Sequence, residues 1–568
     1  MHVQYAANET KGQTQWNAVN WRQANRTVRN LRQRIFKAER QGDHRKVKSL
    51  QKLMLRSYAN TLVSVRRVTQ VNAGKSTPGV DKVVIKTPKA RGKLVDELQT
   101  YQPWQARPTR RVYIPKSNGT LRPLGIPTVK DRVMQVRIKN VLEPQWEARF
   151  ESSSFGFRPG RSTHDAISSI FQLANPQGGK QWILDADIKG AFDNIGHAPL
   201  LKTIGTVPGH GPIKQWLKAG YVDAGLEHET SAGTPQGGII SPLLANIALH
   251  GMEKALGVRR EKSSGRIRGH RAVVRYADDF VVFCESREDA ETAKEELAAW
   301  LGERGLELSE EKTQIVHITT GFDFLGFNVR QYKVPSARLG YRTHTKPSKA
   351  SVQKIRDKLR REWRMLRGTH AGVVIARLNP IIRGWANYFR MGVSSKIFAT
   401  FDHWMFNRVY RWTKSRHSTK PWHWLKEKYW GRWNKSRQDN WVFGDKLTGR
   451  YLLKFAWTKI ERHILVRGNA SPDDASLNQY WEDRRRKAHT LPPTRLKMAR
   501  AQQWKCPVCG GHLLNGEDLQ DHHVILNREH PERNDVKNRR LVHYFCHLQI
   551  HGGHAARPRA AKELLREG

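Results

Sequence analysis

Three aspartates in two short apolar segments are spaced so that they could hold metal ions together. Asp278 and Asp279 interrupt a run of β-branched and aromatic residues, which predicts a hairpin with both acids at its tip. Asp187 closes a second apolar run upstream. Three converging carboxylates would need cations to balance their charge, and Mg²⁺ prefers such oxygen ligands. A pair of Mg²⁺ ions is suited to in-line transfer of a group at phosphorus. A solvated hairpin turn explains Asp278 and Asp279 equally well.

Neighbouring segments carry groups suited to a phosphorylated substrate. Lys116 and Arg122 flank Asn118-Gly119, a pair typical of a hairpin turn, and could bind a triphosphate as a point charge and a fork. Gln236 lies in a glycine-rich loop before an apolar helix, where a substrate could approach the backbone closely. The order of these segments along the chain favours the catalytic interpretation of the three aspartates.

The C-terminal segment contains a second set of candidate metal ligands. Two pairs at zinc-knuckle spacing would suffice for a closed tetrahedral site: Cys506 with Cys509, and His543 with Cys546. His547 and His551 are one helical turn apart and would therefore face the same way. Further candidates between these positions are His522, His523 and Asn538.

The ordered motifs resemble those of the reverse transcriptases encoded by bacterial and organellar group II introns, over nearly the whole chain. The resemblance implies that Asp187 and Asp278 bind Mg²⁺, with Asp279 beside them. It further implies a triphosphate grip by Lys116 and Arg122, a nucleotide site lined by Gln236 and Lys312, exclusion of a ribose 2′-hydroxyl by Phe192, and a primer grip at Phe324, Leu325 and Gly326. Each of these residues could instead have a structural role: Phe192 could be a core aromatic residue and Lys312 a surface charge.

The C-terminal segment resembles the HNH, or ββα-metal, nuclease fold. This resemblance implies that His522, His547 and His551 hold one catalytic divalent metal. It makes His523 the general base that activates water and Asn538 the residue that orients its loop. The implied structural Zn²⁺ ligands are Cys506, Cys509, His543 and Cys546, although the family often has cysteine in place of His543. A zinc module that only binds DNA is the alternative.

Composition predicts a polynucleotide partner. The chain has 100 Lys and Arg against 51 Asp and Glu, a net charge of +49, and such an excess binds phosphate backbones strongly. A membrane-surface protein is disfavoured because no stretch approaches about eighteen uninterrupted apolar residues, and the start has no signal-peptide core. Four cysteines in 568 residues exclude a disulfide scaffold. We therefore expect an intracellular protein, in the bacterial cytoplasm or an organelle interior.

The motif order predicts a multidomain α+β protein built around a right-hand polymerase. The expected domains are a basic, RNA-binding helical extension of the fingers (1–88), reverse transcriptase fingers and palm (89–335), an α-helical thumb or maturase domain (336–415), a basic, tryptophan-rich DNA-binding domain with a linker (416–495), and a zinc-containing HNH endonuclease domain (496–568).

The resemblance implies a multifunctional mobile-element protein. It would use dNTPs and two Mg²⁺ ions as an RNA-directed DNA polymerase on an RNA template and DNA primer. It would assist splicing of its group II intron RNA as a ribonucleoprotein, and its HNH domain would nick target DNA to prime synthesis. The alternatives are a splicing-only maturase, another kind of reverse transcriptase, and a homing nuclease with an inert passenger. The oligomeric state does not follow from the sequence.

Overall fold

The computed structural model describes residues 13–100, 104–115, 119–261, 267–487, 491–525 and 529–552. Within these ranges, no helix combines the length and apolar character needed to cross a bilayer. Lys116 and Asn118 lie outside the described residues, so the structure does not place the tip of the expected triphosphate-binding hairpin.

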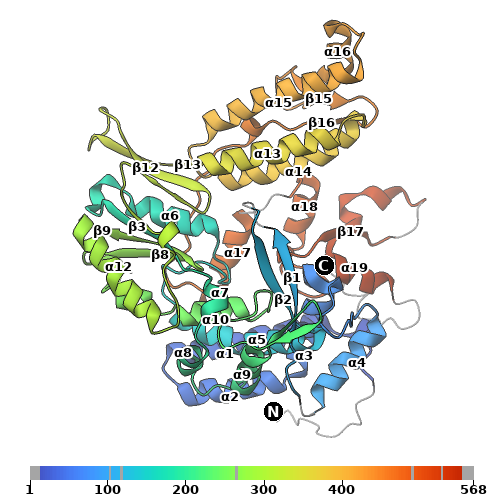
Figure 1. Ribbon diagram of the computed structural model, residues 1–568. Helices are drawn as coiled ribbons and strands as arrows, with labels where there is room; N and C mark the ends of the chain where they lie inside the picture. Colours follow the sequence, from blue (N-terminus) through green and yellow to red (C-terminus); the bar gives the residue numbers. More distant parts are fainter. Residues whose placement is uncertain are drawn as a thin grey trace.

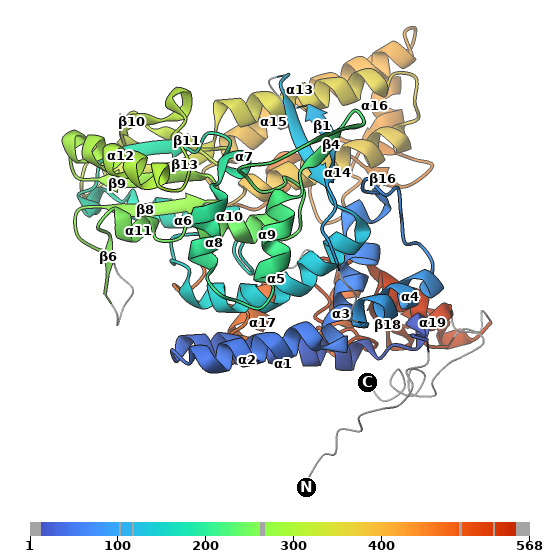
Figure 2. The ribbon, with the colours of Figure 1, turned by 60° about the horizontal axis from the view of Figure 1, so that its bottom comes forward.

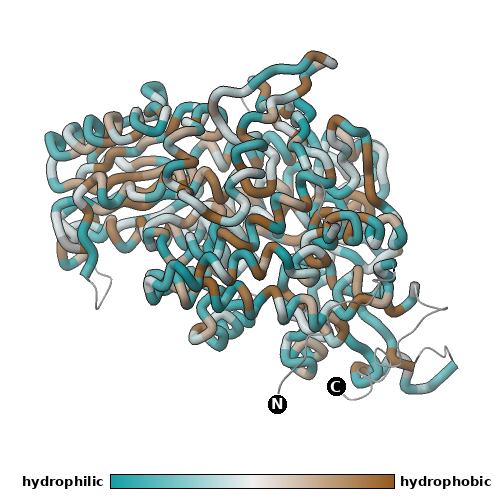
Figure 3. The backbone as a smooth tube through the Cα atoms, turned by 90° about the horizontal axis from the view of Figure 1, so that it is seen from below, coloured by the Kyte–Doolittle hydropathy of each residue, from teal (hydrophilic) through white to brown (hydrophobic). Residues whose placement is uncertain are grey.

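The N-terminal segment forms a layer of amphipathic helices. Its helices are α1 (Trp21–Arg40), α2 (His44–Arg56), α3 (Tyr58–Arg66) and α4 (Pro88–Gln99). Val28, Leu31 and Ile35 recur at helical spacing on α1 and are buried against α2 and α5 (Val129–Arg149). Seen from below, the helices alternate between hydrophilic and hydrophobic colours along their length (Figure 3). The charged faces of α1 and α2 are therefore left on the surface.

The palm is an antiparallel sheet in the order β10-β3-β9-β8. Its strands are β3 (Trp182–Asp187), β8 (Ala272–Tyr276), β9 (Asp279–Cys284) and β10 (Gln314–His317). Alternate residues of β9 face different cores, with Val281 in one and Val282 in the other, so both faces of the sheet are covered. Helices α6 (Thr163–Leu173) and α12 (Arg287–Gly302) pack on this sheet (Figure 1). The expected hairpin around Asp278 is confirmed, because β8 pairs with β9.

The fingers carry a second sheet in the order β2-β1-β4-β5. Its strands are β1 (Thr109–Pro115), β2 (Leu121–Ile126), β4 (Tyr221–Asp223) and β5 (Leu226–His228). Pairing of Pro115 with Leu121 confirms the expected hairpin on either side of the undescribed tip. The remaining elements of fingers and palm are α7 (Ala191–Asn194), α8 (His197–Ile204), α9 (His210–Lys218), α10 (Ser241–Ala248), α11 (Met252–Ala255), β6 (Arg259–Arg260) and β7 (Ile267–Arg268).

A three-stranded sheet connects the palm to a bundle of long helices. The sheet contains β11 (Phe322–Phe324), β12 (Phe327–Lys333) and β13 (Tyr341–Pro347), and the helices are α13 (Lys349–Met365), α14 (Ala371–Phe389) and α15 (Ser395–Arg416). The tryptophan-rich segment follows as α16 (Trp422–Tyr429), β14 (Trp430–Gly431), β15 (Val442–Asp445) and β16 (Arg450–Tyr451). Trp430 and Phe443 share a core with Leu378 of α14 and Trp412 of α15, so this segment packs directly on the helical bundle.

The C-terminal segment begins with α17 (Asn478–Lys487) and α18 (Pro493–Ala501) and ends with β17 (Leu519–His523), β18 (Arg539–His543) and α19 (Tyr544–His551). The two strands pair antiparallel and are followed directly by a helix, giving a ββα unit. This unit lies beside α3 and α4, the opposite end of the chain, as both ribbon views show (Figures 1 and 2).

Candidate functional site

The palm hairpin brings the three predicted aspartates together. Asp187 is the last residue of β3 and pairs directly across the sheet with Asp279, the first residue of β9, while Asp278 lies in the turn between β8 and β9. The turn is held in place by the side chain of Arg275, a residue that is only 1% exposed. Its guanidinium donates to the Ala277 carbonyl oxygen at 3.1 Å, and Ala277 adopts a left-handed φ of 61°. A buried arginine therefore fixes the geometry of the acid cluster.

The three aspartates carry more negative charge than the basic side chains beside them balance. Partial desolvation raises the pKa of Asp279 to about 7, and the neighbouring Asp278 and Asp187 carboxylates add to the shift. Burial likewise raises the pKa of Asp278. Lys312 forms an ion pair with Asp187, which raises the pKa of its ammonium group. Arg122 and Lys312 also act on the charge of Asp278, but the donor set of the three aspartates is all oxygen and fits divalent cations such as Mg²⁺.

A fourth carboxylate, which was not predicted from the sequence, lies near the cluster. Asp185 lies two residues before Asp187 on β3, and residues at this spacing share a face of a strand. Its side chain accepts a hydrogen bond from Gln314 Nε2 at 3.0 Å, and burial raises its pKa to about 6. The two-residue spacing of the acids was the sequence signal that could have identified it.

On the fingers side, three polar side chains form a continuous hydrogen-bonded row. Arg122 Nε donates to Gln236 Oε1 at 2.8 Å, and Gln236 Nε2 donates to Asp193 Oδ2 at 2.8 Å. The row connects β2 to α7 through the glycine-rich loop. Two of its members were predicted to bind nucleotide, whereas Asp193 was not identified, and its position one residue after Phe192 was the available signal.

Phe192 lies at the start of the same region and is buried. Its ring packs edge-to-face on Phe157, with centroids 5.9 Å apart and planes at 77°. Phe157 is itself exposed and has a left-handed φ of 60°, a backbone conformation unusual for a bulky residue. Thr234 N of the glycine-rich loop donates to the Phe192 carbonyl oxygen at 2.6 Å, which ties the backbone at Phe192 to the loop that carries Gln236.

The expected primer-grip segment is the tight turn between β11 and β12. Leu325 and Gly326 have φ values of 48° and 82°, as a two-residue hairpin turn requires, and Phe324 is buried beneath them. Tyr388 of α14 donates its hydroxyl to the Leu325 carbonyl oxygen at 2.8 Å. Ser351 of α13 donates to the Gly326 carbonyl oxygen at 2.9 Å. The turn is therefore clamped by two helices of the adjoining bundle.

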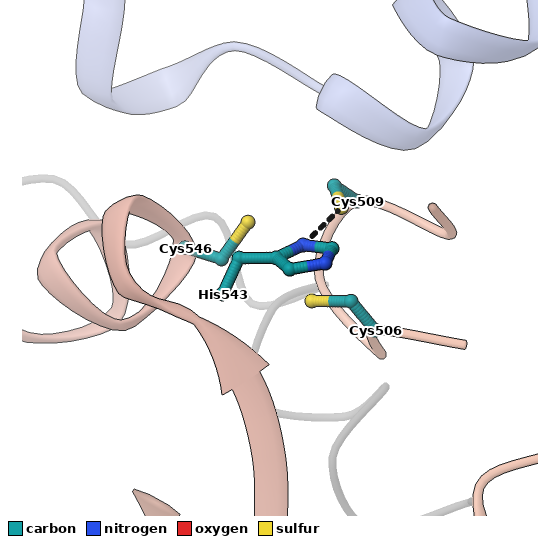
Figure 4. Close-up of side chains that lie close together, drawn as sticks. All are labelled: Cys506, Cys509, His543 and Cys546. Carbon is teal, nitrogen blue, oxygen red and sulfur yellow. Dashed lines mark hydrogen bonds between the residues drawn. The ribbon is translucent and has the colours of Figure 1, made fainter. Parts of the chain in front are cut away.

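The four predicted zinc ligands converge in the C-terminal segment, and all four are buried. Their ligand atoms lie within 4.8 Å of one another (Figure 4). Cys509 Sγ is 3.3 Å from His543 Nδ1, and His543 Nε2 is 3.2 Å from the His512 carbonyl oxygen. Donation from Nε2 to that carbonyl leaves Nδ1 free to face the three sulfurs. Three thiols and one imidazole in a closed arrangement fit a structural Zn²⁺ ion.

The thiols and the imidazole also perturb one another electrostatically. Burial alone would lower the pKa of His543, but hydrogen bonds with Cys506 and Cys509 outweigh it and raise this pKa to about 10. Hydrogen bonds from Cys509 and Cys546 hold the pKa of Cys506 well below its ordinary value. A thiolate at this position is the protonation state that a metal ligand needs.

A second cluster joins His522 of β17 to His547 and His551 of α19. Their ligand atoms lie within 4.8 Å of one another, and His547 and His551 approach to 3.2 Å between Nε2 atoms. Burial lowers the pKa of His547, with a further contribution from His551, and this favours the neutral form that binds metal. The donor set fits one divalent metal.

The two other predicted nuclease residues border this cluster. His523 follows His522 on β17, so its side chain points to the other face of the strand. Asn538 Oδ1 accepts a hydrogen bond from Ile525 N at 2.7 Å, and its carbonyl oxygen accepts one from Val524 N at 2.9 Å. Asn538 thus holds the loop that follows His523.

The tryptophan-rich segment presents indoles on its surface as well as in its core. Trp430 is buried, whereas Trp422 and Trp441 are 37% and 46% exposed. The two exposed rings are parallel within 5°, with centroids 6.3 Å apart. Lys426 Nζ lies 4.9 Å from the Trp441 ring centroid. This pair combines flat aromatic surface with positive charge, as a nucleic-acid base-stacking surface does.

Three protein-family models match the chain. The model of the N-terminal domain of reverse transcriptase matches residues 16–98, that of the reverse transcriptase (RNA-dependent DNA polymerase) residues 114–329, and that of the group II intron maturase-specific domain residues 352–430. The acid cluster, the Arg122–Gln236–Asp193 row and the primer-grip turn all lie inside the second match. None of these three models extends to the two C-terminal clusters.

Similar curated proteins cover the same part of the chain. Protein YkfC of Escherichia coli K12 is 37% identical over 304 residues, which are 47% of this chain and 79% of YkfC. The group II intron-encoded protein LtrA of Lactococcus lactis is 32% identical over 51% of this chain, which spans 58% of LtrA. A solved telomerase from Candida albicans aligns with a TM-score of 0.32 and 15% identity over 57% of this chain and 61% of the telomerase, a likeness too weak to carry an argument.

Proposed function

The chain belongs to the family of group II intron-encoded reverse transcriptases and maturases, and from this premise we propose that it is an RNA-directed DNA polymerase. The observation that carries the proposal is the acid cluster where β3 meets β9. In this proposal Asp187 of β3 and Asp278 of the β8–β9 turn are the metal ligands, and Asp279 adjoins them. Two Mg²⁺ ions held there would clamp the attacking 3′-oxygen of the primer and the leaving pyrophosphate oxygen.

The surrounding residues bind and orient the two substrates. Lys116 and Arg122 hold the triphosphate of the incoming dNTP, and Gln236 lines the nucleotide site, where it is fixed by its hydrogen bonds to Arg122 and Asp193. Phe192 blocks a ribose 2′-hydroxyl. Lys312, paired with Asp187 in the absence of substrate, is close enough to the cluster to meet the phosphates.

The Leu325–Gly326 turn grips the primer end, and its hydrogen bonds from α13 and α14 transmit the position of the thumb to the primer. Template RNA and primer DNA are therefore held between the palm and the helical bundle.

A maturase role rests on the α13–α15 bundle, which supplies the surface for intron RNA. Ile355, Leu359 and Trp363 bury one face of α13. The opposite face exposes Lys354, Lys358, Arg361 and Arg364. A row of cations on a fixed helix suits the phosphate backbone of a folded RNA. In this proposal the protein binds its intron RNA as a ribonucleoprotein and assists its splicing.

The ββα unit is a metal-dependent DNA endonuclease in this proposal. His522, His547 and His551 hold the divalent metal, His523 takes the proton of the attacking water, and Asn538 fixes the loop after His523. The nearby zinc site stabilises the unit, and nicking of target DNA supplies the 3′-hydroxyl that primes synthesis.

Primer extension on an RNA template with Mg²⁺ tests the polymerase. The wild type should make template-length DNA, and Asp278→Ala should make none while binding the primed template equally well. Tight RNA binding with no product from the wild type would favour a maturase that acts in splicing alone.

Nicking of duplex DNA by the ribonucleoprotein tests the nuclease. His547→Ala should abolish the nick while primer extension on a preformed primer stays at the wild-type level. Unchanged nicking by His547→Ala would reduce the C-terminal segment to a DNA-binding module.

A further inference from the structure

The C-terminal module, residues 491–552, shares one hydrophobic core with the N-terminal helices. Leu541 and Cys546 of the module are buried in the same cluster as Trp21 and Leu62 of α1 and α3. In Figure 4 ribbon in the faint blue of the N-terminal part of the chain lies above the four predicted zinc ligands. The two ends of the chain therefore fold against each other.

Polar contacts from α1 reach the backbone of the zinc knuckle itself. Arg22 Nη2 donates to the Pro507 carbonyl oxygen at 2.9 Å, and Asn25 Nδ2 donates to the Cys509 carbonyl oxygen at 3.4 Å. In the other direction, Gln549 of α19 donates to the carbonyl oxygens of Asn17 at 3.0 Å and Val19 at 3.1 Å. The knuckle is thus held by residues more than 450 positions away in sequence.

Arg66, the last residue of α3, points into this contact and is only 6% exposed. Its Nη2 lies 3.3 Å from Cys546 Sγ and 3.2 Å from Glu517 Oε2. Its guanidinium carbon lies 4.7 Å from the centroid of the Trp21 ring. A buried guanidinium requires anionic partners, and beside Glu517 those that act on this arginine are the sulfurs of two proposed metal ligands, Cys546 and Cys509.

The formal charge of the proposed metal site explains why a cation belongs there. Zn²⁺ bound by three thiolates and a neutral imidazole carries a net charge of −1, and this charge is fully enclosed by protein. We propose that Arg66 is the counter-ion of this zinc–thiolate cluster, and that through it metal loading of the C-terminal module and packing of the N-terminal helices stabilise each other. The inference rests on the proposed zinc site and adds to it a positioning residue from the fingers.

The coupling acts in both directions, because linkage between two equilibria is reciprocal. An arginine that favours the metal-loaded module must also hold α3 and α1 more firmly when the metal is bound. The basic face of α1 lies on this helix layer, so zinc would support the nucleic-acid surface of the fingers as well as the module that contains the ligands.

Zinc affinity measured by competition with a chromophoric chelator on the full chain tests the counter-ion role. Arg66→Met keeps much of the side-chain volume but removes the charge, and should weaken zinc binding on the order of tenfold to a hundredfold. Arg66→Lys keeps the charge and should bind zinc more tightly than Arg66→Met. Equal affinity of Arg66→Met and the wild type would overturn the inference.

Two control variants separate this role from general loss of packing. Arg32 is a mostly buried arginine of the N-terminal layer, with its side chain 14% exposed, but its partners are Glu143 and Asp473, so Arg32→Met should leave zinc affinity unchanged. Glu517→Gln removes the other anion beside Arg66 and leaves the arginine to the thiolate. It should bind zinc at least as tightly as the wild type. A loss in Glu517→Gln as large as in Arg66→Met would show that Arg66 acts only through Glu517, and would overturn the inference.

Hydrogen exchange on the wild type provides a measurement that needs no variant. Removal of zinc by a chelator should speed amide exchange in α1 and α3, and leave α12 of the palm unchanged. Faster exchange confined to residues 491–552 would overturn the coupling while leaving the zinc site intact. A wild-type protein that binds no zinc would instead refute the zinc site and the coupling together.

Discussion

Asp187 and Asp279 are direct cross-strand partners at the adjoining ends of β3 and β9. Two carboxylates in this arrangement repel each other, and Asp278 in the next position adds a third. The hairpin therefore holds a concentration of negative charge that bound cations or protonation of a carboxylate would relieve. Several consequences of this arrangement can be measured.

The metal-free protein should lose stability as the pH rises through about 7, because the pKa of Asp279 is raised to about 7 in the fold. A raised carboxyl pKa means that the folded state binds the proton more tightly than the unfolded state, so this contribution is fully present below about pH 4 and is lost through pH 7. Metal-free Asp279→Asn should consequently melt at a higher temperature than the wild type at pH 8, with the two converging toward about pH 4. Parallel melting curves at every pH would contradict the assignment.

Phe192→Val should relax discrimination against ribonucleotides. If the buried ring blocks a 2′-hydroxyl, a smaller side chain removes the clash, and the preference for dNTPs over rNTPs should fall by about tenfold or more. Steady-state kinetics with matched dNTP and rNTP pairs would measure the change. Phe171→Val on the exposed side of α6 is a control that should keep the wild-type preference.

Tyr388→Phe should shorten the products of primer extension. The substitution deletes only the hydroxyl that holds the Leu325 carbonyl, a loss of about 1 kcal/mol. The primer end should dissociate more often, while the KM for dNTP stays unchanged because the nucleotide side of the cleft is untouched. Tyr332→Phe, further along β12, is the matched control; a change in KM without a change in product length would refute the clamp.

Trp441→Ala should weaken binding of single-stranded nucleic acid. Stacking of one base contributes about 1–3 kcal/mol, so the Kd should rise roughly fivefold to a hundredfold. Fluorescence anisotropy with a labelled single strand would report it. Trp300→Ala removes a partly buried indole from the palm instead and should leave binding intact. Equal losses in both variants would point to destabilisation rather than stacking.

Local patterns in the sequence were sufficient to predict the palm hairpin and the four knuckle ligands, whereas the set of His522, His547 and His551 came from the resemblance to the HNH nuclease fold. A strand–turn–strand signal is local, so Tyr276 pairs with Asp279 as expected. The knuckle pairs and the one-turn spacing of His547 and His551 are local as well, and the structure brings their side chains together. The catalytic and metal-binding roles of these residues remain predictions.

Contacts between distant segments could not be predicted in this way. Arg66 and Cys546 are 480 residues apart, and no periodicity of either segment signals that they meet. Trp430 and Phe443 of the tryptophan-rich segment share the core of α14 and α15, a contact that the composition of this segment does not signal. Asp185 was overlooked for a different reason, since a second acid in the same strand is also compatible with a solvated edge.

The central claim is that Asp187 and Asp278 jointly hold the catalytic metal ions. The most direct test counts Mn²⁺ ions bound to the protein with a primed RNA template and the next dNTP, by electron paramagnetic resonance, for the wild type and Asp187→Asn. The cluster of His522, His547 and His551 is unchanged in both proteins, so the difference in the number of bound Mn²⁺ ions reports on the palm site alone. We predict that Asp187→Asn binds fewer ions and synthesises no DNA. Equal metal occupancy in the two proteins would contradict the account.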